Sequence, residues 1–277
     1  MFRRLGFLLV VVGALAVVPA ASAAYPTPFA AQDGSGVLSL DGSMRFVAHK
    51  SGTNTLVSAI RTNDGTTTKS QTVDGAFGIP TITQNGLMGG LFHDGSALVL
   101  QNMGIGTTSH FMILGASDLS ARDSITLKGT FGFDALSPDG SKLYLIQHTS
   151  KDDLQHYVVR VYDLKEHSLL AGRIADKTQK SWLMQGFAVN RATTQNGRWV
   201  YTLYANPGGF PFIHALDTVR GVAHCIGLPW RTTNQGPVFN FGLTVKGKYL
   251  EVRWQDGRLY RLVNRTSWRL STKPVAR

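Results

Sequence analysis

The sequence predicts an all-β fold, specifically a single β-propeller of five four-stranded blades, with six blades as the alternative count. A turn signal recurs five times, and successive copies lie 45–57 residues apart. No segment shows the 3.6-residue apolar periodicity of an amphipathic helix, so helices should be rare or absent. With 43% hydrophobic residues in 277, the chain can bury a core, which excludes wholesale disorder.

The recurring signal is a polar residue and a glycine between two apolar strands. Asp-Gly and Asn-Gly turns favour hairpins because both turn residues tolerate positive φ. The turn glycines are Gly42, Gly95, Gly140, Gly197 and, in a degenerate copy, Gly247. Each interval is long enough for four antiparallel strands and their loops. We therefore expect the five glycines at equivalent places, between the two inner strands of successive blades.

Further strands should fill the intervals between the turns. They are expected at 157–164 and 169–174, and at 212–216 and 222–228. Small residues dominate the segments that enter the hairpins, as expected where strands crowd around a common axis; these segments are 86–91, 129–133, 186–189 and 239–242. The segment 29–37 is placed to close the ring by completing the last blade.

The amino terminus has the features of an export signal. Arg3 and Arg4 precede an apolar run at 5–18, and Ala21-Ser22-Ala23 forms a small-x-small cleavage site. We predict a signal peptide at 1–23 and a propeller domain at 24–277, with a secreted or envelope-associated location. An uncleaved anchor is the alternative, although the run is shorter than the roughly 20 residues that span a bilayer. No second apolar stretch of that length follows, so no integral membrane segment is expected after cleavage.

The charge and cysteine content limit the partners. The formal net charge is +11, but the basic residues form no long cluster, so nucleic-acid binding is not expected. The cations near the C-terminus alternate with aromatic and aliphatic residues, a pattern that suits contact with an anionic envelope polymer. Cys225 is the single cysteine and cannot form an internal disulfide; a buried thiol is expected. We expect a monomer.

Two stretches resemble known sequences. Ser137-Pro138-Asp139-Gly140-Ser141-Lys142-Leu143-Tyr144 resembles the Ser-Pro-Asp-Gly-x-x-Leu-Tyr signature of WD40-like propeller repeats, as in the family of the periplasmic TolB protein and bacterial surface propellers. The stretches 198–204 and 211–218 resemble uncharacterised secreted proteins of high-GC Gram-positive bacteria. The first resemblance implies a propeller fold, which scaffolds and enzymes share.

Catalytic groups are hard to identify. Glycoside hydrolysis needs two carboxylates, yet most candidate aspartates belong to Asp-Gly turns: Asp41, Asp64, Asp94, Asp139 and Asp256. Asp134 is on an expected inner strand, and Asp74 directly precedes another. The eight histidines show no metal-ligand spacing, and no G-x-S-x-G nucleophile motif is present. We therefore predict no catalytic residue, metal site or cofactor.

The loops that lead into the inner strands offer a binding rim. Trp182 and Trp230 could stack on a sugar or aromatic group, while Lys180 and Arg231 could pair with an anion. The alternative is that the tryptophans pack between blades and the cations are solvated. The sequence thus favours an exported non-catalytic binding or scaffold protein whose partner is an unknown protein or an anionic envelope polymer. A propeller hydrolase or lactonase is the alternative; three converging histidines or carboxylates at a channel mouth would favour it, whereas an apolar or cationic mouth would favour binding.

Overall fold

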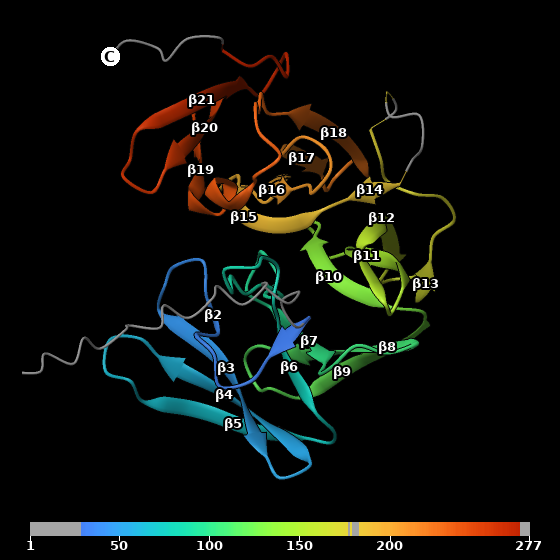
Figure 1. Ribbon diagram of the computed structural model, residues 1–277. Helices are drawn as coiled ribbons and strands as arrows, with labels where there is room; N and C mark the ends of the chain where they lie inside the picture. The colour runs from blue at the N-terminus through green and yellow to red at the C-terminus, as the bar shows by residue number, and fades with distance from the viewer. Residues whose placement is uncertain (1–28, 177, 179–182, 272–277) are drawn as a thin grey trace, which may run out of the picture.

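The computed structural model describes residues 29–176, 178 and 183–271, and within them the all-β prediction is confirmed. The strands form five antiparallel sheets that follow one another along the chain and are arranged around a common centre (Figure 1). This arrangement is that of a β-propeller. In the described part of the chain the helical structure is one short 3₁₀ turn, η1 (Gly236–Asn240), and no helix there could cross a membrane.

The first two sheets come from the N-terminal part of the chain. The first sheet has the order β2 (Val37–Leu38), β3 (Met44–Ser51), β4 (Asn54–Arg61) and β5 (Thr67–Val73). The second has the order β1 (Ala30–Ala31), β6 (Phe77–Pro80), β7 (Ala97–Asn102), β8 (Thr108–Gly115) and β9 (Ala121–Lys128).

The remaining three sheets repeat the same meander. The third contains β10 (Phe131–Leu136), β11 (Lys142–Ser150), β12 (Asp153–Asp163) and β13 (Ser168–Leu169), with β14 (Met184–Gln185) also paired to β12. The fourth contains β15 (Phe187–Thr193), β16 (Trp199–Ala205), β17 (Phe212–Asp217) and β18 (Val222–Gly227). The fifth contains β19 (Phe241–Lys246), β20 (Tyr249–Trp254) and β21 (Leu259–Asn264). The strands expected after the third and fourth turns are therefore confirmed, with shorter bounds for the strand expected at 169–174.

The turn glycines occupy the same place in all five sheets, between the strand that enters the hairpin and the next one; the strand pairs are β2 and β3, β6 and β7, β10 and β11, β15 and β16, and β19 and β20. All five have positive φ, between 54° and 72°. One backbone hydrogen bond recurs with them: the residue directly after each third strand donates its N–H to the carbonyl of the residue after the glycine, at 2.8–2.9 Å. The five bonds are Thr62 to Ser43, Ala116 to Ser96, Leu164 to Ser141, Thr218 to Arg198 and Arg265 to Lys248. The sequence repeats are thus structural repeats.

Two predicted segments differ from the structure. The segment 86–91 is an inner strand only at its end, where Leu91 forms a bridge with Leu98 of β7. β6 provides the rest of the pairing, with Phe77 opposite Asn102, and the intervening chain folds back as a loop with a bridge between Thr81 and Met88. The segment 29–37 does not complete the last sheet either. Ala30 and Ala31 instead pair with β6 at the inner edge of the second sheet. Gly78 permits this approach, because a Cβ there would lie 2.7 Å from the Ala31 carbonyl oxygen.

Apolar packing joins each sheet to the next. Four clusters of buried apolar residues lie between sheets one and two, two and three, three and four, and four and five. None of these four clusters, which cover only the described residues, joins the fifth sheet to the first. Five sheets are observed, whereas the choice between five and six blades stays a prediction.

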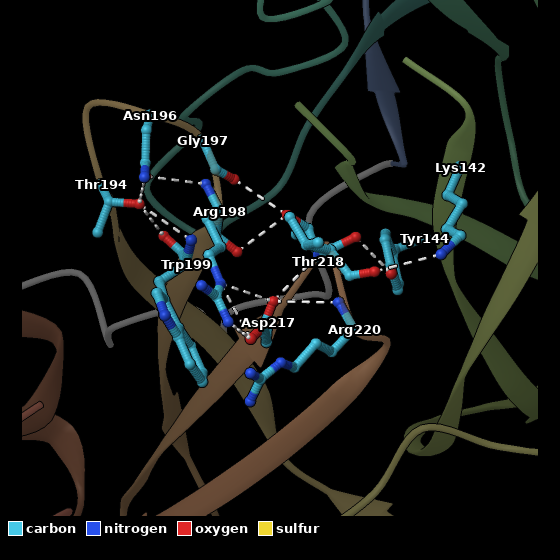
Figure 2. Close-up of polar contacts among 11 residues, drawn as sticks. Lys142, Tyr144, Thr194, Asn196, Gly197, Arg198, Trp199, Asp217, Thr218 and Arg220 are labelled. Atoms are coloured by element: carbon cyan, nitrogen blue, oxygen red, sulfur yellow. Dashed lines mark hydrogen bonds and ion pairs between the residues drawn. The ribbon is translucent and has the colours of Figure 1, made fainter. Parts of the chain in front are cut away.

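The tyrosine of the Ser-Pro-Asp-Gly signature ties the third sheet to the fourth. Tyr144 on β11 donates its hydroxyl to the Thr218 carbonyl at 2.7 Å, in the turn that follows β17 (Figure 2). Asp217 organises this turn and is fully buried. Its carboxylate accepts hydrogen bonds from two guanidinium nitrogens of Arg198 at 2.7–3.2 Å, and from the backbone N–H groups of the two residues after Thr218 at 3.1 Å. Burial raises the pKa of Asp217, but the Arg198 and backbone donors outweigh it and hold that pKa below its usual range. These contacts all hold the turn to its own sheet, so the cluster is structural.

Candidate functional site

A cavity of about 80 Å³ lies where the inner strands of the second, third and fourth sheets converge. We call it the central cavity. Its walls combine aromatic side chains with two glycines, Gly132 on β10 and Gly186 directly before β15. The lining residues used below are Phe29, Thr81, Gly132, His148, Tyr157 and Tyr204. The central cavity therefore occupies the part of the fold where sequence analysis expected a channel mouth.

Four aromatic rings that line the cavity form a row, which continues beyond the cavity to Phe212. Phe29 stacks on His148 with 5.1 Å between ring centroids and an interplanar angle of 12°. His148 is 6.0 Å from Tyr157, which stacks on Tyr204 at 5.6 Å, and Tyr204 stacks on Phe212 at 5.0 Å. Such rings offer flat apolar surfaces and a few polar atoms at their edges, as in sites that bind planar or ring-shaped groups.

Three buried polar atoms of the cavity lack a hydrogen-bond partner in the described structure. They are Thr81 Oγ1, His148 Nδ1 and Tyr157 Oη; the last lies near Tyr204 but makes no hydrogen bond of acceptable geometry. Leaving a buried polar atom unpaired costs about 1–3 kcal/mol. Such atoms are rare in folded proteins, and here three line one small space. A bound polar group in the cavity would satisfy them.

The central cavity is electrically neutral near pH 7. Burial lowers the pKa of His148 to about 4, and the backbone of Leu154 and the charge of Asp153 only partly oppose this. Burial also raises the pKa of Tyr157 and of Tyr204 well above the usual value. Neutral imidazole and phenol groups donate and accept hydrogen bonds but do not attract an ion strongly. The site is therefore suited to an uncharged polar group.

The inner-strand carboxylate Asp134 is held in an ion pair. Arg191 on β15 binds both the carboxylate and the main-chain carbonyl of Asp134 on β10, and its Nε donates to Thr202 Oγ1 at 2.9 Å. Both charged side chains are almost fully buried, with exposed fractions of 4% and 5%. The pair thus ties the third sheet to the fourth. Among the described residues no group of three or more His, Cys, Asp or Glu side chains could hold a metal ion.

The predicted rim residues are only partly placed. Lys180 and Trp182 lie outside the described residues. Trp230 is half-buried between the fourth and fifth sheets, where it meets Phe241 at 6.0 Å and Tyr260 at 6.3 Å, and its Nε1 donates to the Asn234 carbonyl at 3.0 Å. Arg231, the next residue, is exposed. The rim site stays a prediction, and Trp230 has packing contacts that favour its structural interpretation.

Sequence reasoning did not identify the central cavity residues. His148, Tyr157 and Tyr204 stand in ordinary alternating strands, where aromatic residues usually contribute to the core. Phe29 lies in a segment assigned to another sheet. The one available signal was the glycine-rich character of 129–133 and 186–189, which placed these segments near the axis.

The protein was compared with family models, curated proteins and solved structures. No family model and no curated protein matches. Among the solved structures, TolB from Acinetobacter baumannii is 14% identical with a TM-score of 0.46, and the match covers 82% of this chain and 52% of that one. A putative 6-phosphogluconolactonase from Bacteroides uniformis is 18% identical with a TM-score of 0.47, covering 83% and 67%. The Cps50 (Swd1) β-propeller domain from Myceliophteria thermophila is 10% identical with a TM-score of 0.48, covering 85% and 68%.

These similarities concern the fold only. The resemblance to a TolB-type propeller is confirmed at that level, while the resemblance to secreted proteins of Gram-positive bacteria stays a prediction. The chain corresponds to about half the length of the TolB structure. No residue role is transferred from any of these proteins.

Proposed function

We propose that this protein is an exported, non-catalytic propeller that binds a larger partner through the central cavity. The cavity would take one uncharged polar group of that partner, such as a sugar unit or a single side chain. The observation that carries the proposal is the set of three unpaired polar atoms, Thr81 Oγ1, His148 Nδ1 and Tyr157 Oη, within one aromatic-lined space.

The size of the cavity supports a partial ligand rather than a whole one. Sites for drug-sized ligands typically enclose about 300–1,000 Å³, whereas the central cavity has about 80 Å³. A group inserted between Phe29 and the backbone of 81–84 would gain ring stacking and up to three hydrogen bonds. The rest of the partner would lie on the surface of the second, third and fourth sheets.

The alternative of a hydrolase or lactonase has less support. The inner-strand carboxylate, Asp134, is committed to Arg191 and is almost fully buried, so it is poorly placed to act as an acid or base. The central cavity presents aromatic rings and neutral polar atoms instead of converging carboxylates. An apolar, uncharged mouth is the feature expected for binding.

Charge distribution supports an anionic polymer as the partner. Residues 183–271 contain 11 Lys and Arg against 3 Asp and Glu, whereas residues 29–176 contain 11 against 14. The fourth and fifth sheets therefore form a basic half beside an acidic one. A polymer with anionic units would be attracted to the basic half while an uncharged unit entered the central cavity.

Export is proposed from the N-terminal sequence. Arg3, Arg4, the apolar run at 5–18 and the small residues up to Ala23 support cleavage before Ala24. Mass analysis of the protein recovered from culture medium or the cell envelope should give Ala24 or a neighbour as the first residue. An intact Met1 on a membrane-bound form would contradict the proposal.

Binding at the central cavity can be separated from stability. His148→Phe removes an unpaired buried nitrogen, so the variant should be as stable as the wild type or more stable. The same variant should bind at least tenfold more weakly, because it loses a hydrogen-bonding atom. The measurement is saturation-transfer NMR with two probes, an N-acetylglucosamine trimer and the tripeptide Gly-Tyr-Gly, alongside urea unfolding. Tyr249→Phe, on the outward face of the fifth sheet, is the control. Failure of both probes to bind, or equal binding by the variant, would contradict the proposal.

A further inference from the structure

A second hollow lies between the outer ends of the fourth and fifth sheets, away from the central cavity. We call it the Phe210 groove. It measures about 540 Å³, within the usual range for ligand sites. It lies between the loop that precedes β17, the end of β18, and the segment from β21 onward. The residues that line it are Phe210, Gly227, Leu228, Pro229, Arg261, Leu270 and Ser271.

The walls and floor of the groove are apolar and open. Phe210 is 64% exposed, which is unusual for a large aromatic side chain on a water-facing loop. Gly227 forms part of the floor: a Cβ built there would meet no atom within 4 Å, and its φ lies outside the left-handed region. The glycine is therefore not required by the backbone, and its lack of a side chain keeps the groove open. Leu228, beneath the floor, is 2% exposed and anchors the segment in the core.

One cation stands at the edge of this apolar surface. The Arg261 guanidinium lies 4.4 Å above the Tyr260 ring, and its Nη1 donates to the Tyr260 carbonyl at 2.7 Å. Within the described part of the chain the nearby carboxylates are paired with other arginines: Glu251 with Arg253 at 2.8 Å and Asp256 with Arg258 at 2.7 Å. Arg261 therefore keeps donors for an external anion. Ser271 is the other lining residue with a polar side chain; its hydroxyl accepts the Leu262 N–H at 3.3 Å and keeps its own hydrogen free to donate.

We propose that the Phe210 groove binds an acyl chain with a carboxylate head group. The chain would lie along Phe210, Gly227 and Leu270, while the carboxylate accepts hydrogen bonds from Arg261 and Ser271. Charge complementarity favours this occupant, because a planar guanidinium pairs well with a carboxylate and the surrounding two sheets carry a large excess of cations. A neutral chain would leave Arg261 unpaired, and a cationic chain would be repelled. This inference does not depend on the function proposed for the central cavity.

The head group can be tested with two matched probes. In titration calorimetry of the mature protein, decanoate should bind at least tenfold more tightly than decyltrimethylammonium, which has the same chain and the opposite charge. Arg261→Gln should weaken decanoate binding at least tenfold and should not weaken decyltrimethylammonium binding, because it removes a like charge. Arg258→Gln, in the turn before β21, is the matched control and should bind decanoate like the wild type. Equal affinity for the two probes, or an unchanged affinity in Arg261→Gln, would overturn the assignment.

The location can be tested by filling the groove. Gly227→Val places a side chain into the open space without backbone strain, and it should reduce decanoate affinity at least tenfold. Phe210→Ser changes an exposed residue, preserves the core, and should also weaken binding by at least threefold. Circular dichroism confirms that each variant is folded. Wild-type affinity in both folded variants would place the acyl chain elsewhere and overturn the proposal.

Discussion

The two halves of the ring use one repeat position in different ways. Four residues after the turn glycine, the first and second sheets carry Phe46 and Val99, which are buried in apolar clusters shared with the next sheet. The third and fourth sheets carry Tyr144 and Tyr201 there. Tyr144 of the third sheet donates a hydrogen bond to the Thr218 carbonyl of the fourth sheet. Tyr201 of the fourth sheet accepts a hydrogen bond at 2.8 Å from Arg265, which follows the last strand of the fifth sheet. The same place in the meander thus supports either pure apolar packing or packing with a polar link.

The fifth sheet shows what the position becomes where no following cluster is described. Glu251 stands four residues after Gly247, and it pairs along its own strand with Arg253 at 2.8 Å. A carboxylate at this position would be costly inside an apolar interface. At this repeat position the fifth sheet therefore carries an ion pair where the other four sheets carry an aromatic or aliphatic side chain.

The largest expected effect concerns the buried ion pair between the third and fourth sheets. Arg191→Met leaves the Asp134 carboxylate buried without a partner, so it should lower the free energy of unfolding by about 3–5 kcal/mol. Urea denaturation measures this loss. Arg253→Met, on the outward face of the fifth sheet, should cost about 1 kcal/mol or less. Equal losses would show that the two pairs are equally solvated and that the contrast is wrong. Asp134→Leu combined with Arg191→Met should recover much of the loss.

Acid should weaken the same half of the ring. Burial lowers the pKa of both His148 and His214 to about 4, while the unfolded chain has a histidine pKa near 6.5. The unfolded state therefore binds more protons between these values. The associated stability is complete above about pH 6.5 and falls as pH drops toward 4, by at most roughly 3 kcal/mol per histidine.

His214 offers the sharper test of this pH dependence. Both of its ring nitrogens are buried and unpaired, and the charges that act on it are those of Asp134, Arg191 of its own sheet, and Asp176. His214→Leu should flatten the profile of unfolding free energy between pH 7 and pH 4.5, measured by urea denaturation. His110→Gln, an exposed histidine of the second sheet, should leave the profile unchanged. A profile that is the same in His214→Leu and the wild type would refute the assignment.

The tyrosine links should differ in strength from each other. Tyr144→Phe leaves the carbonyl of the fully buried Thr218 without its donor, and we expect a loss of about 1–3 kcal/mol. Tyr201→Phe removes an acceptor from Arg265, which is part-exposed and can turn to water, so the loss should stay near about 1 kcal/mol or below. Thermal unfolding of both variants gives the comparison. A larger loss for Tyr201→Phe would reverse our ranking of the two interfaces.

The smallest effect is expected on the outward face of the fifth sheet. Glu251→Gln keeps the side-chain shape and removes one charge from a pair whose cations, Arg253 and Lys246, reach solvent, so the change should be below about 1 kcal/mol. Denaturation in urea at low and high salt provides the measurement. A loss above about 2 kcal/mol would show that this face packs against another surface in solution.

The repeat could be predicted from the sequence because each turn depends on residues that are adjacent in the chain. Asp-Gly and Asn-Gly turns impose positive φ on a few adjacent residues, and strand alternation follows directly on each side, so four of the five turn positions carry a clear signal. The same locality explains the errors. The segment 86–91 has the small residues of an inner strand, but only its end at Leu91 pairs with β7, because Phe77 and Gly78 pair with the other end of that strand.

The candidate site was not readable in the same way. Asp134 was recognised on an inner strand, yet its partner Arg191 is 57 residues away and has no motif. His148, Tyr157 and Phe29 come from three segments whose patterns are those of ordinary strands and a loop. Their polar atoms are left unpaired because the three segments enclose one cavity, and the spacing of residues along the sequence does not predict that.

The sequence by itself determined the all-β class, the five-fold repeat and the place of each turn glycine, since these depend on backbone preferences of a few neighbouring residues. Tertiary structure alone decided which sheet Ala30 and Ala31 join, which carboxylate is neutralised, and where uncharged polar atoms are left without partners. These outcomes depend on how sheets pack against one another. Burial changes the cost of a charge or an unpaired polar atom by several kcal/mol, and burial is defined only once the sheets surround a common centre.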